Sequence, residues 1–319
     1  SRDRDPSGRV PDRRPHRRPS GHRRLPLSGA HSTGQRVGEA ADDQRGSRAR
    51  HTRRVTTVTI DAAIALTVQQ AGDVALCVAV APPHQPGDLA VQAVDGTPVP
   101  TRVVLTDGGW AHIADLPAED VEVTYRAEVG LHPADAAEAS DVDVLVYRRP
   151  SRYCPSDRLA GLAADQFGHL APADAVMAIE AWLNASLAYV PGSTDAVDDA
   201  LHPLLARTGV CRDYAHLGVA LCRALGIPAR YSAAYAPGLS PMDFHAVFEA
   251  AIDGRWWVFD GTRLAPRASL VRIATGRDAA DTAPLTPLSA FTGTMSTQLT
   301  VTTSGDLPHD DRSSLVALR

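Results

Sequence analysis

The chain has 319 residues, of which 44% are hydrophobic and four are cysteine, so it can bury a large core without disulfide staples. Its net charge of −5 is unevenly spread: residues 1–54 hold 15 Arg against 6 acidic residues, whereas the remainder is acidic. Residues 1–54 contain no aromatic residue, and we expect them to form a disordered Arg-rich extension. The lack of aromatic residues there and the acidic remainder of the chain argue against nucleic-acid binding. No stretch approaches the roughly 18 apolar residues of a membrane helix, so we expect a cytoplasmic protein with no membrane partner.

Residues 55–150 have the pattern of a β-sandwich. Runs rich in β-branched residues at 55–70 and 72–82, and an alternating run at 121–129, are separated by Pro- and Gly-containing breaks. Cys77 falls inside the second run, so we expect it to pack in the core of that sandwich.

The pattern changes near residue 150, where helical segments begin. Helices are expected over 155–168, over 171–190 and from Cys211 to a stop at Gly226 and Pro228. Strands are expected to follow at 229–237, 244–262 and 296–306. The sequence therefore predicts an α+β protein whose parts are an extension at 1–54, a sandwich at 55–150, a catalytic domain at 151–305 and a tail at 306–319.

Cys211 falls at the start of the third expected helix. Unpaired N–H groups and the helix dipole favour an anion there, so a thiol in this place ionises more easily. Cys222 lies in the apolar part of the same helix, and we interpret it as core packing. Asp213, in the first turn, is expected to stabilise the helix N-terminus, and His216 is expected to be structural because it points away from the thiol.

A hairpin in 244–262 brings a histidine and a carboxylate together. Asp253-Gly254 is a strong two-residue turn signal between apolar strands. With that turn, His245 and Asp260 become diagonal neighbours on one face, about 7–8 Å apart along the backbone. A nucleophilic cysteine needs a base and a group that orients the base. We therefore predict Cys211 as nucleophile, His245 as base and Asp260 as orienting carboxylate, although each residue taken singly is more often structural.

Three blocks of sequence carry a family resemblance. They read GVCRDYAHLGVALCRALGIPARY at 209–231, DFHAVFEA at 243–250 and RWWVFDGTRLAPR at 255–267. The chain resembles the bacterial transglutaminase-like superfamily, a papain-like group of cysteine hydrolases with a Cys-His-Asp triad. The resemblance covers roughly 150–300, and residues 55–150 are similar to the β-rich domain that often precedes this core. Many relatives have Trp where this chain has Val247 and Pro or Ala where it has Gly261, which puts the shape of the substrate groove in doubt.

The resemblance implies acyl transfer on amide bonds through a thioester, without metal or cofactor. We expect hydrolysis of a peptide or protein substrate, as in a cysteine protease, isopeptidase or amidase. Two alternatives stay open: transamidation by a second amine, as in a transglutaminase, and a non-catalytic peptide-binding scaffold. The Cys211 N–H is one expected donor to the oxyanion, and Tyr189 or Trp182 could supply the other. Cys154 is expected to be structural, with a second reactive thiol as the alternative, and Arg230 and Tyr231 could touch substrate.

Overall fold

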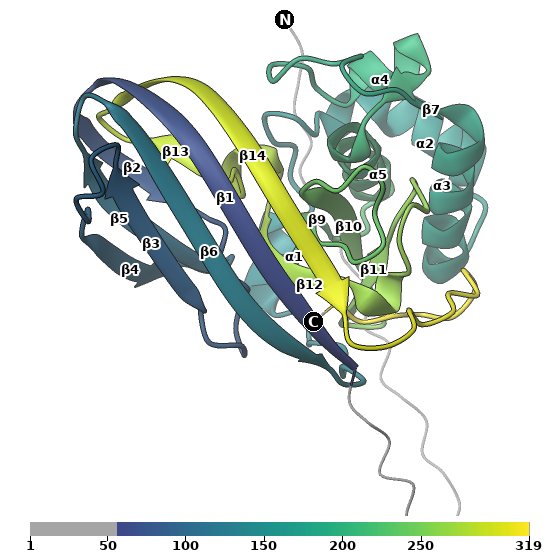
Figure 1. Cartoon of the computed structure of the whole chain (residues 1–319). Helices are drawn as coiled ribbons and strands as arrows, with labels where there is room; N and C mark the ends of the chain where they lie inside the picture. Colours follow the sequence, from purple (N-terminus) through teal and green to yellow (C-terminus); the bar gives the residue numbers. More distant parts are fainter. Residues whose placement is uncertain (1–55, 319) are drawn as a thin grey trace, which may run out of the picture. The chain divides into compact units, whose positions relative to one another are not determined.

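The computed structural model describes residues 56–318, so the Arg-rich extension expected at 1–54 lies outside the described residues. The described residues belong to one compact unit, in which a β-rich lobe lies beside a lobe of helices and strands (Figure 1). Within residues 56–318, every helix is too short or too polar to cross a membrane.

The first lobe is a sandwich of two antiparallel four-stranded sheets, with strand orders β14-β1-β6-β3 and β13-β2-β5-β4. Its strands are β1 (Thr56–Gln70), β2 (Gly72–Leu76), β3 (Asp88–Ala93), β4 (Thr101–Leu105), β5 (Trp110–Leu116), β6 (Asp120–Leu131), β13 (Leu285–Pro287) and β14 (Phe291–Thr303). Alternate residues of β1, such as Ile60 and Ile64, are fully buried between the sheets, as the period of a half-buried strand requires.

The strand expected at 296–306 is present as β14, and it forms one edge of the first sheet of the sandwich. It pairs antiparallel with β1 along most of its length, with Ile60 opposite Val301. By its hydrogen bonds, β14 therefore belongs with the strands of 55–150, although the sequence placed it in the segment 151–305.

The second lobe confirms the expected α+β core, in which helices pack on an antiparallel sheet of order β11-β10-β9-β12. Its strands are β9 (Ala229–Tyr235), β10 (His245–Ile252), β11 (Arg255–Phe259) and β12 (Val271–Gly276). Its helical segments are α1 (Asp141–Val146), η1 (Ser156–Leu159), α2 (Ala160–Phe167), α3 (Pro172–Ser186), α4 (Leu201–Ala206), α5 (Cys211–Ala224), η2 (Arg267–Ser269) and η3 (Ala279–Asp281). Two short strands, β7 (Ala188–Tyr189) and β8 (Thr208–Gly209), pair in parallel.

Two local expectations are corrected. The helix expected over 171–190 ends at Ser186, because the next residues leave it to pair with β8. The strand expected over 72–82 ends at Leu76, so Cys77 lies beyond it and is partly exposed rather than buried in the sandwich.

The two lobes are joined by hydrogen bonds. The hydroxyl of Tyr235 on β9 donates to the Val78 carbonyl at 2.6 Å, and the Thr275 N–H on β12 donates to the Gly108 carbonyl at 2.9 Å. A Cβ at Gly108 would stand 2.1 Å from the Thr275 carbonyl oxygen, so this approach requires glycine. These contacts fix the sandwich against the sheet that carries the candidate site.

The C-terminal segment expected as a tail covers the face of the core sheet that the helices leave open. Leu318 is buried against Val247 and Val258, and the Val258 N–H donates to the Val316 carbonyl at 2.8 Å. Asp310 forms two hydrogen bonds with the guanidinium of Arg267, which is 1% exposed. The sheet is therefore covered on both faces.

Candidate active site

Cys211 is the first residue of α5, as the sequence predicts. The Asp213 carboxylate accepts hydrogen bonds from the Val210 N–H and the Thr194 hydroxyl, both at 2.7 Å, and so holds the chain at the helix entry. A Cβ on Gly209 would approach that of Asp213 to 2.8 Å, which explains the glycine. Asp213 therefore stabilises the helix N-terminus, and the thiol stands where the dipole favours an anion.

The helix lies close against the sheet because Gly218 faces Phe248 of β10. A Cβ on Gly218 would come within 2.6 Å of the Phe248 ring. The helix side of the sheet is a single apolar cluster that includes Leu217, Leu221 and Cys222. This packing brings the start of α5 next to the start of β10, and therefore Cys211 next to His245.

The hairpin has the predicted register. Asp253 and Gly254 form the turn with φ values of 51° and 73°, and Ile252 pairs with Arg255 and Phe248 with Phe259. His245 Nε2 and Asp260 Oδ2 are 3.0 Å apart, and both side chains are almost fully buried. The carboxylate and the imidazole are therefore brought together as expected.

Asp260 is held from two further sides. Its Oδ1 accepts hydrogen bonds from the Thr262 N–H at 2.9 Å and the Thr262 hydroxyl at 2.7 Å, and its own N–H donates to Glu180 of α3 at 3.4 Å. Burial would raise the pKa of Asp260, but the charge of His245 and the hydrogen bonds from His245 and Thr262 lower it. The carboxylate is therefore ionised and cannot rotate away from the imidazole.

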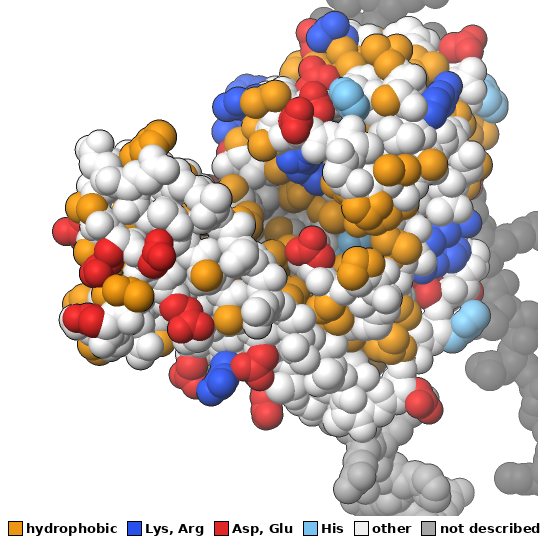
Figure 2. Space-filling model, turned by 45° about the horizontal axis from the view of Figure 1, so that its top comes forward, with side chains coloured by type: hydrophobic (Ala, Val, Ile, Leu, Met, Phe, Trp, Pro, Cys, Tyr) orange, Lys and Arg blue, Asp and Glu red, His pale blue; other side chains and the backbone are white. Residues whose placement is uncertain are grey.

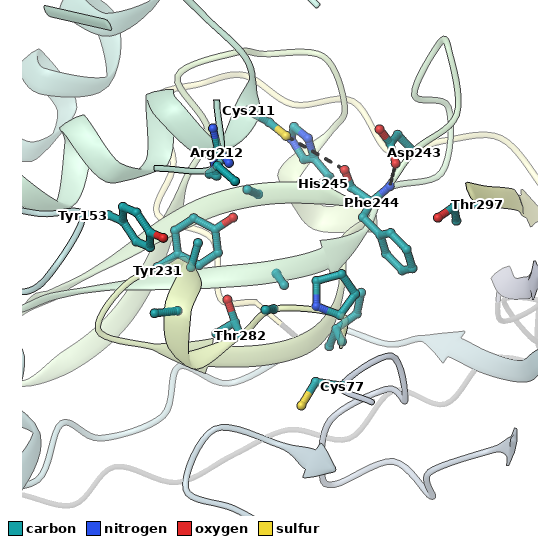
Figure 3. A pocket seen from close by; sticks show the side chains of 18 of the residues that line it. Cys77, Tyr153, Cys211, Arg212, Tyr231, Asp243, Phe244, His245, Thr282 and Thr297 are labelled. Atoms are coloured by element: carbon teal, nitrogen blue, oxygen red, sulfur yellow. Dashed lines mark hydrogen bonds between the residues drawn. The ribbon is translucent and has the colours of Figure 1, made fainter. Parts of the chain in front are cut away.

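The remaining nitrogen of His245 serves the thiol. Its Nδ1 is buried and forms no hydrogen bond with a described residue, and the Cys211 side chain interacts electrostatically with the ring. Burial would lower the pKa of His245, but the charge and hydrogen bond of Asp260, together with Cys211, raise it to about 10. Figure 3 shows the Cys211 sulfur beside the imidazole, and the sulfur lies 3.9 Å from the Phe244 carbonyl oxygen.

Tyr189 reaches the same thiol from another element. The parallel pairing of β7 with β8 sets Tyr189 opposite Gly209, two residues before Cys211. The Tyr189 hydroxyl interacts with both the backbone and the side chain of Cys211, and partial burial and the charges of Cys211 and Asp243 raise its pKa to about 12. Trp182 packs edge-on against Phe167, with ring centroids 6.2 Å apart.

The other cysteines are not placed for chemistry with His245. Cys154 and Cys222 are fully buried, and burial raises the pKa of Cys154 to about 12 and that of Cys222 further. All four thiols are free. Arg230 is paired with Glu249 inside the sheet and does not line the cavity described next, whereas Tyr231 does.

A cavity of about 690 Å³ opens beside Cys211 and His245 (Figure 3). It is bounded on one side by β9 and β10, and on the other by Cys77, Met295 and Thr297 of the sandwich lobe. In the space-filling view, hydrophobic side chains gather in the hollow between the two lobes (Figure 2). Val247, at the position where many relatives have Trp, does not line the cavity, because it packs under the C-terminal segment.

Within residues 56–318, no group of three or more His, Cys, Asp or Glu side chains is arranged to hold a metal ion.

Comparison with known proteins finds a matching family model and a similar solved structure. The model of the transglutaminase-like superfamily matches residues 161–261, which include Cys211, His245 and Asp260. The crystal structure of a candidate cysteine protease from Cytophaga hutchinsonii is 32% identical, covers 82% of this chain and 96% of its own, and superposes with a TM-score of 0.69.

Two other relatives are more distant or more partial. An uncharacterised protein of Mycobacterium leprae (strain TN) is 32% identical over 150 residues, or 43% of this chain, and this match spans about half (52%) of that protein's length. The periplasmic domain of TgpA from Pseudomonas aeruginosa is 18% identical over 65% of this chain and 90% of its own, with a TM-score of 0.35. The family match over the three site residues and the near-complete match to the Cytophaga structure show that this chain belongs to the transglutaminase-like superfamily.

Proposed function

We propose that the protein is a cysteine hydrolase that cleaves amide bonds in peptides or proteins. The observation that carries the proposal is the hydrogen bond between His245 and Asp260, with the Cys211 sulfur beside the imidazole, at the mouth of a cavity. The His245 Nδ1 takes the thiol proton, and the sulfur attacks the amide carbonyl carbon. The resulting tetrahedral intermediate collapses to a thioester, and His245 gives its proton to the leaving amine.

The second half of the reaction uses the same groups. His245 takes a proton from water, whose oxygen attacks the thioester carbonyl and releases the acid and the thiol. Asp260 keeps a proton on Nε2, so Nδ1 is the nitrogen that takes and returns the thiol proton, and Asp260 stabilises the charged imidazolium that stands beside the thiolate. No step needs a metal or a cofactor.

The tetrahedral intermediate carries a negative oxygen that needs hydrogen-bond donors. The Cys211 N–H, at the start of α5, is one proposed donor, because the first N–H groups of a helix have no partner within it. The Tyr189 hydroxyl, which interacts with the Cys211 backbone, is the second proposed donor. Partial burial keeps this hydroxyl protonated, as a donor must be.

Replacing Tyr189 with phenylalanine is expected to lower kcat about 100-fold with little change in KM, because only a transition-state hydrogen bond is lost. The matched control is Tyr214→Phe, since the Tyr214 hydroxyl donates to the Leu187 carbonyl at 2.8 Å rather than toward the thiol. Equal kcat values for Tyr189→Phe and the parent would remove Tyr189 from the mechanism.

Hydrolysis is favoured over transamidation because water is always present as an acceptor for the acyl group. The test is digestion of a peptide library, with products identified by mass spectrometry, in the presence and absence of a primary amine such as methylamine. New carboxyl termini that depend on Cys211 support hydrolysis, whereas amine adducts in their place support transamidation. If the parent and Cys211→Ala both leave the library intact but bind peptides, the chain is a binding scaffold.

A further inference from the structure

The cavity at Cys211 extends well beyond the reacting atoms. Cys77 lies at its opposite end from Cys211 (Figure 3). Its volume of about 690 Å³ falls in the range of pockets that enclose small ligands, roughly 300–1,000 Å³. The scissile amide fills only a small part of this volume, so the rest can hold another part of the substrate.

Charged side chains line this cavity only near the thiol. Among the described lining residues, Arg212, Asp243 and His245 can carry a charge, and all three lie close to Cys211 in Figure 3. Arg212 Nη2 donates to the Asp195 carbonyl at 2.6 Å, and Asp243 Oδ1 accepts from the Phe244 N–H at 2.7 Å. The remaining wall is largely alanine with larger apolar side chains, among them Met242, Phe244, Ile273, Pro284 and Met295. A charged group buried there would lose water without gaining a partner.

An aromatic stack makes one wall rigid. His216 lies between Tyr153 and Tyr231, with ring centroids 5.2 Å and 5.0 Å away. Its Nε2 accepts a hydrogen bond from the Ala279 N–H at 3.1 Å, and burial lowers the pKa of His216 to about 3, so the ring is neutral. Tyr153, Tyr231 and Ala279 all line the cavity, whereas His216 is buried behind them.

One polar atom of this wall is left for a ligand. Tyr231 is 6% exposed, yet its hydroxyl forms no hydrogen bond with any residue of the described part of the chain. Figure 3 shows this hydroxyl directed into the cavity rather than toward the core. The hydroxyl is therefore open to the cavity, and because a tyrosine hydroxyl can both donate and accept a hydrogen bond, it is available to a polar group of a bound substrate.

We propose that this cavity is a specificity subsite for a bulky uncharged side chain, aromatic or long aliphatic, on the acyl side of the scissile amide. The Tyr231 hydroxyl hydrogen-bonds to the same substrate segment. The acyl side is chosen because the cavity opens directly at Cys211, to which the acyl part stays bonded in the thioester. This inference rests on the proposed cysteine chemistry and names the class of substrate: polypeptide segments with a large apolar residue beside the cleaved bond.

The test uses acetyl-X-chloromethyl ketones and acetyl-X-Gly-chloromethyl ketones, where X is Phe, Leu, Lys or Glu. The Cys211 sulfur forms a thioether with the methylene carbon, and chloride leaves. We expect the second-order rate with Phe or Leu to exceed that with Lys or Glu at least 30-fold in one of the two series. Comparable rates with Lys or Glu in both series would overturn the proposal.

Two variants and one matched control test whether the preference for Phe or Leu arises in this cavity. Ala280→Trp fills the cavity from an exposed position of η3. It is expected to lower the ratio of the rate with Phe to the rate with Lys or Glu at least tenfold. Ala164→Trp adds the same side chain on α2, at an exposed alanine outside the cavity lining, and is expected to leave the preference unchanged. Tyr231→Phe is expected to weaken binding of the preferred probe about 3- to 10-fold, the effect of one hydrogen bond. An unchanged preference in Ala280→Trp, or unchanged binding in Tyr231→Phe, counts against the subsite.

Iodoacetamide separates the two possible failures, because it alkylates a thiol without needing a subsite. If Cys211 reacts with iodoacetamide ahead of the other thiols but shows no preference among the probes, only the subsite proposal fails. If Cys211 has no such advantage with iodoacetamide, the proposed function fails first. The iodoacetamide rate of each variant must match the parent, which also shows that the variant is folded at the site.

Discussion

Replacing Asp260 with asparagine is expected to lower kcat by roughly 10⁴-fold while the fold is retained. The Asp260 carboxylate accepts hydrogen bonds on both sides, from His245 Nε2 and from the N–H and hydroxyl of Thr262. Asparagine has only one acceptor oxygen, and the fixed N–H of Thr262 competes for it. The amide NH₂ group then faces His245 and forces the ring proton onto Nδ1. The nitrogen beside the thiol can no longer act as a base.

The measurement is the rate of cleavage of the best peptide from the library digestion, with the free energy of unfolding recorded for the same samples. Thr262→Val is a graded comparison, because it removes the hydroxyl bond to Asp260 but keeps the N–H bond and the carboxylate. We expect its kcat to fall far less than that of Asp260→Asn. An Asp260→Asn protein that keeps more than a tenth of the parental kcat would show that Asp260 does not orient the base.

Glu249→Gln is expected to destabilise the protein by about 3–5 kcal/mol, because it leaves buried cations without their counter-charge. Glu249 is fully buried and accepts hydrogen bonds from Arg230 at 2.9 Å, Ser232 at 2.7 Å and Arg272 at 2.6 Å. Burial would raise the pKa of Glu249, but the charges of the two arginines lower it. The Arg230 guanidinium also stacks 4.1 Å from the Trp256 ring centre, so it cannot turn to water.

This cluster joins two of the sequence blocks that carry the family resemblance. Arg230 and Glu249 pair across β9 and β10, so the strand that follows α5 is tied to the strand that begins with His245. The measurement is chemical denaturation of the parent, Glu249→Gln and the control Asp61→Asn, whose ion pair with Arg126 is exposed. Asp61→Asn is expected to unfold like the parent, and a Glu249→Gln protein as stable as that control would contradict the role assigned to the cluster.

Local turn and helix chemistry explains how much of the site could be predicted from the sequence. The Asp253-Gly254 turn fixes the register of β10 with β11, and a one-residue slip would turn His245 and Asp260 to opposite faces. Gly209 and Asp213 mark the helix entry at which Cys211 stands. These signals lie within a few residues of the groups that they position, so sequence patterns were sufficient.

The parts that could not be predicted depend on contacts between distant segments. β14 pairs with β1 from the opposite end of the described chain and carries Met295 and Thr297 to the cavity. The short pairing of β7 with β8 ends α3 early and moves Tyr189 to the thiol, which helix period alone does not show. One feature of the sequence could have pointed to Glu180, which accepts a hydrogen bond from the Asp260 N–H. It is an acidic residue next to the buried stripe of α3 formed by Val176, Ile179 and Leu183.

The proposed activation of Cys211 by His245 can be tested by the pH profile of alkylation at each cysteine. Iodoacetamide labelling, assigned by mass spectrometry, is followed from pH 5 to 10 in the parent and in His245→Ala. The pKa of His245 is raised to about 10, so the ring is charged below that pH and stabilises a thiolate beside it. It loses this charge only as the pH rises through about 10, whereas burial raises the pKa of Cys77, Cys154 and Cys222.

We therefore expect Cys211 to be alkylated rapidly already at pH 6, ahead of the other three thiols, and His245→Ala to remove this advantage. The contrary result is a Cys211 whose alkylation rises only near pH 8.5, as for a free thiol at roughly that value, and is the same with and without His245. The Cys-His-Asp arrangement would then not be an assembled catalytic unit, and the peptide-binding scaffold would replace the enzyme as the better explanation of this fold.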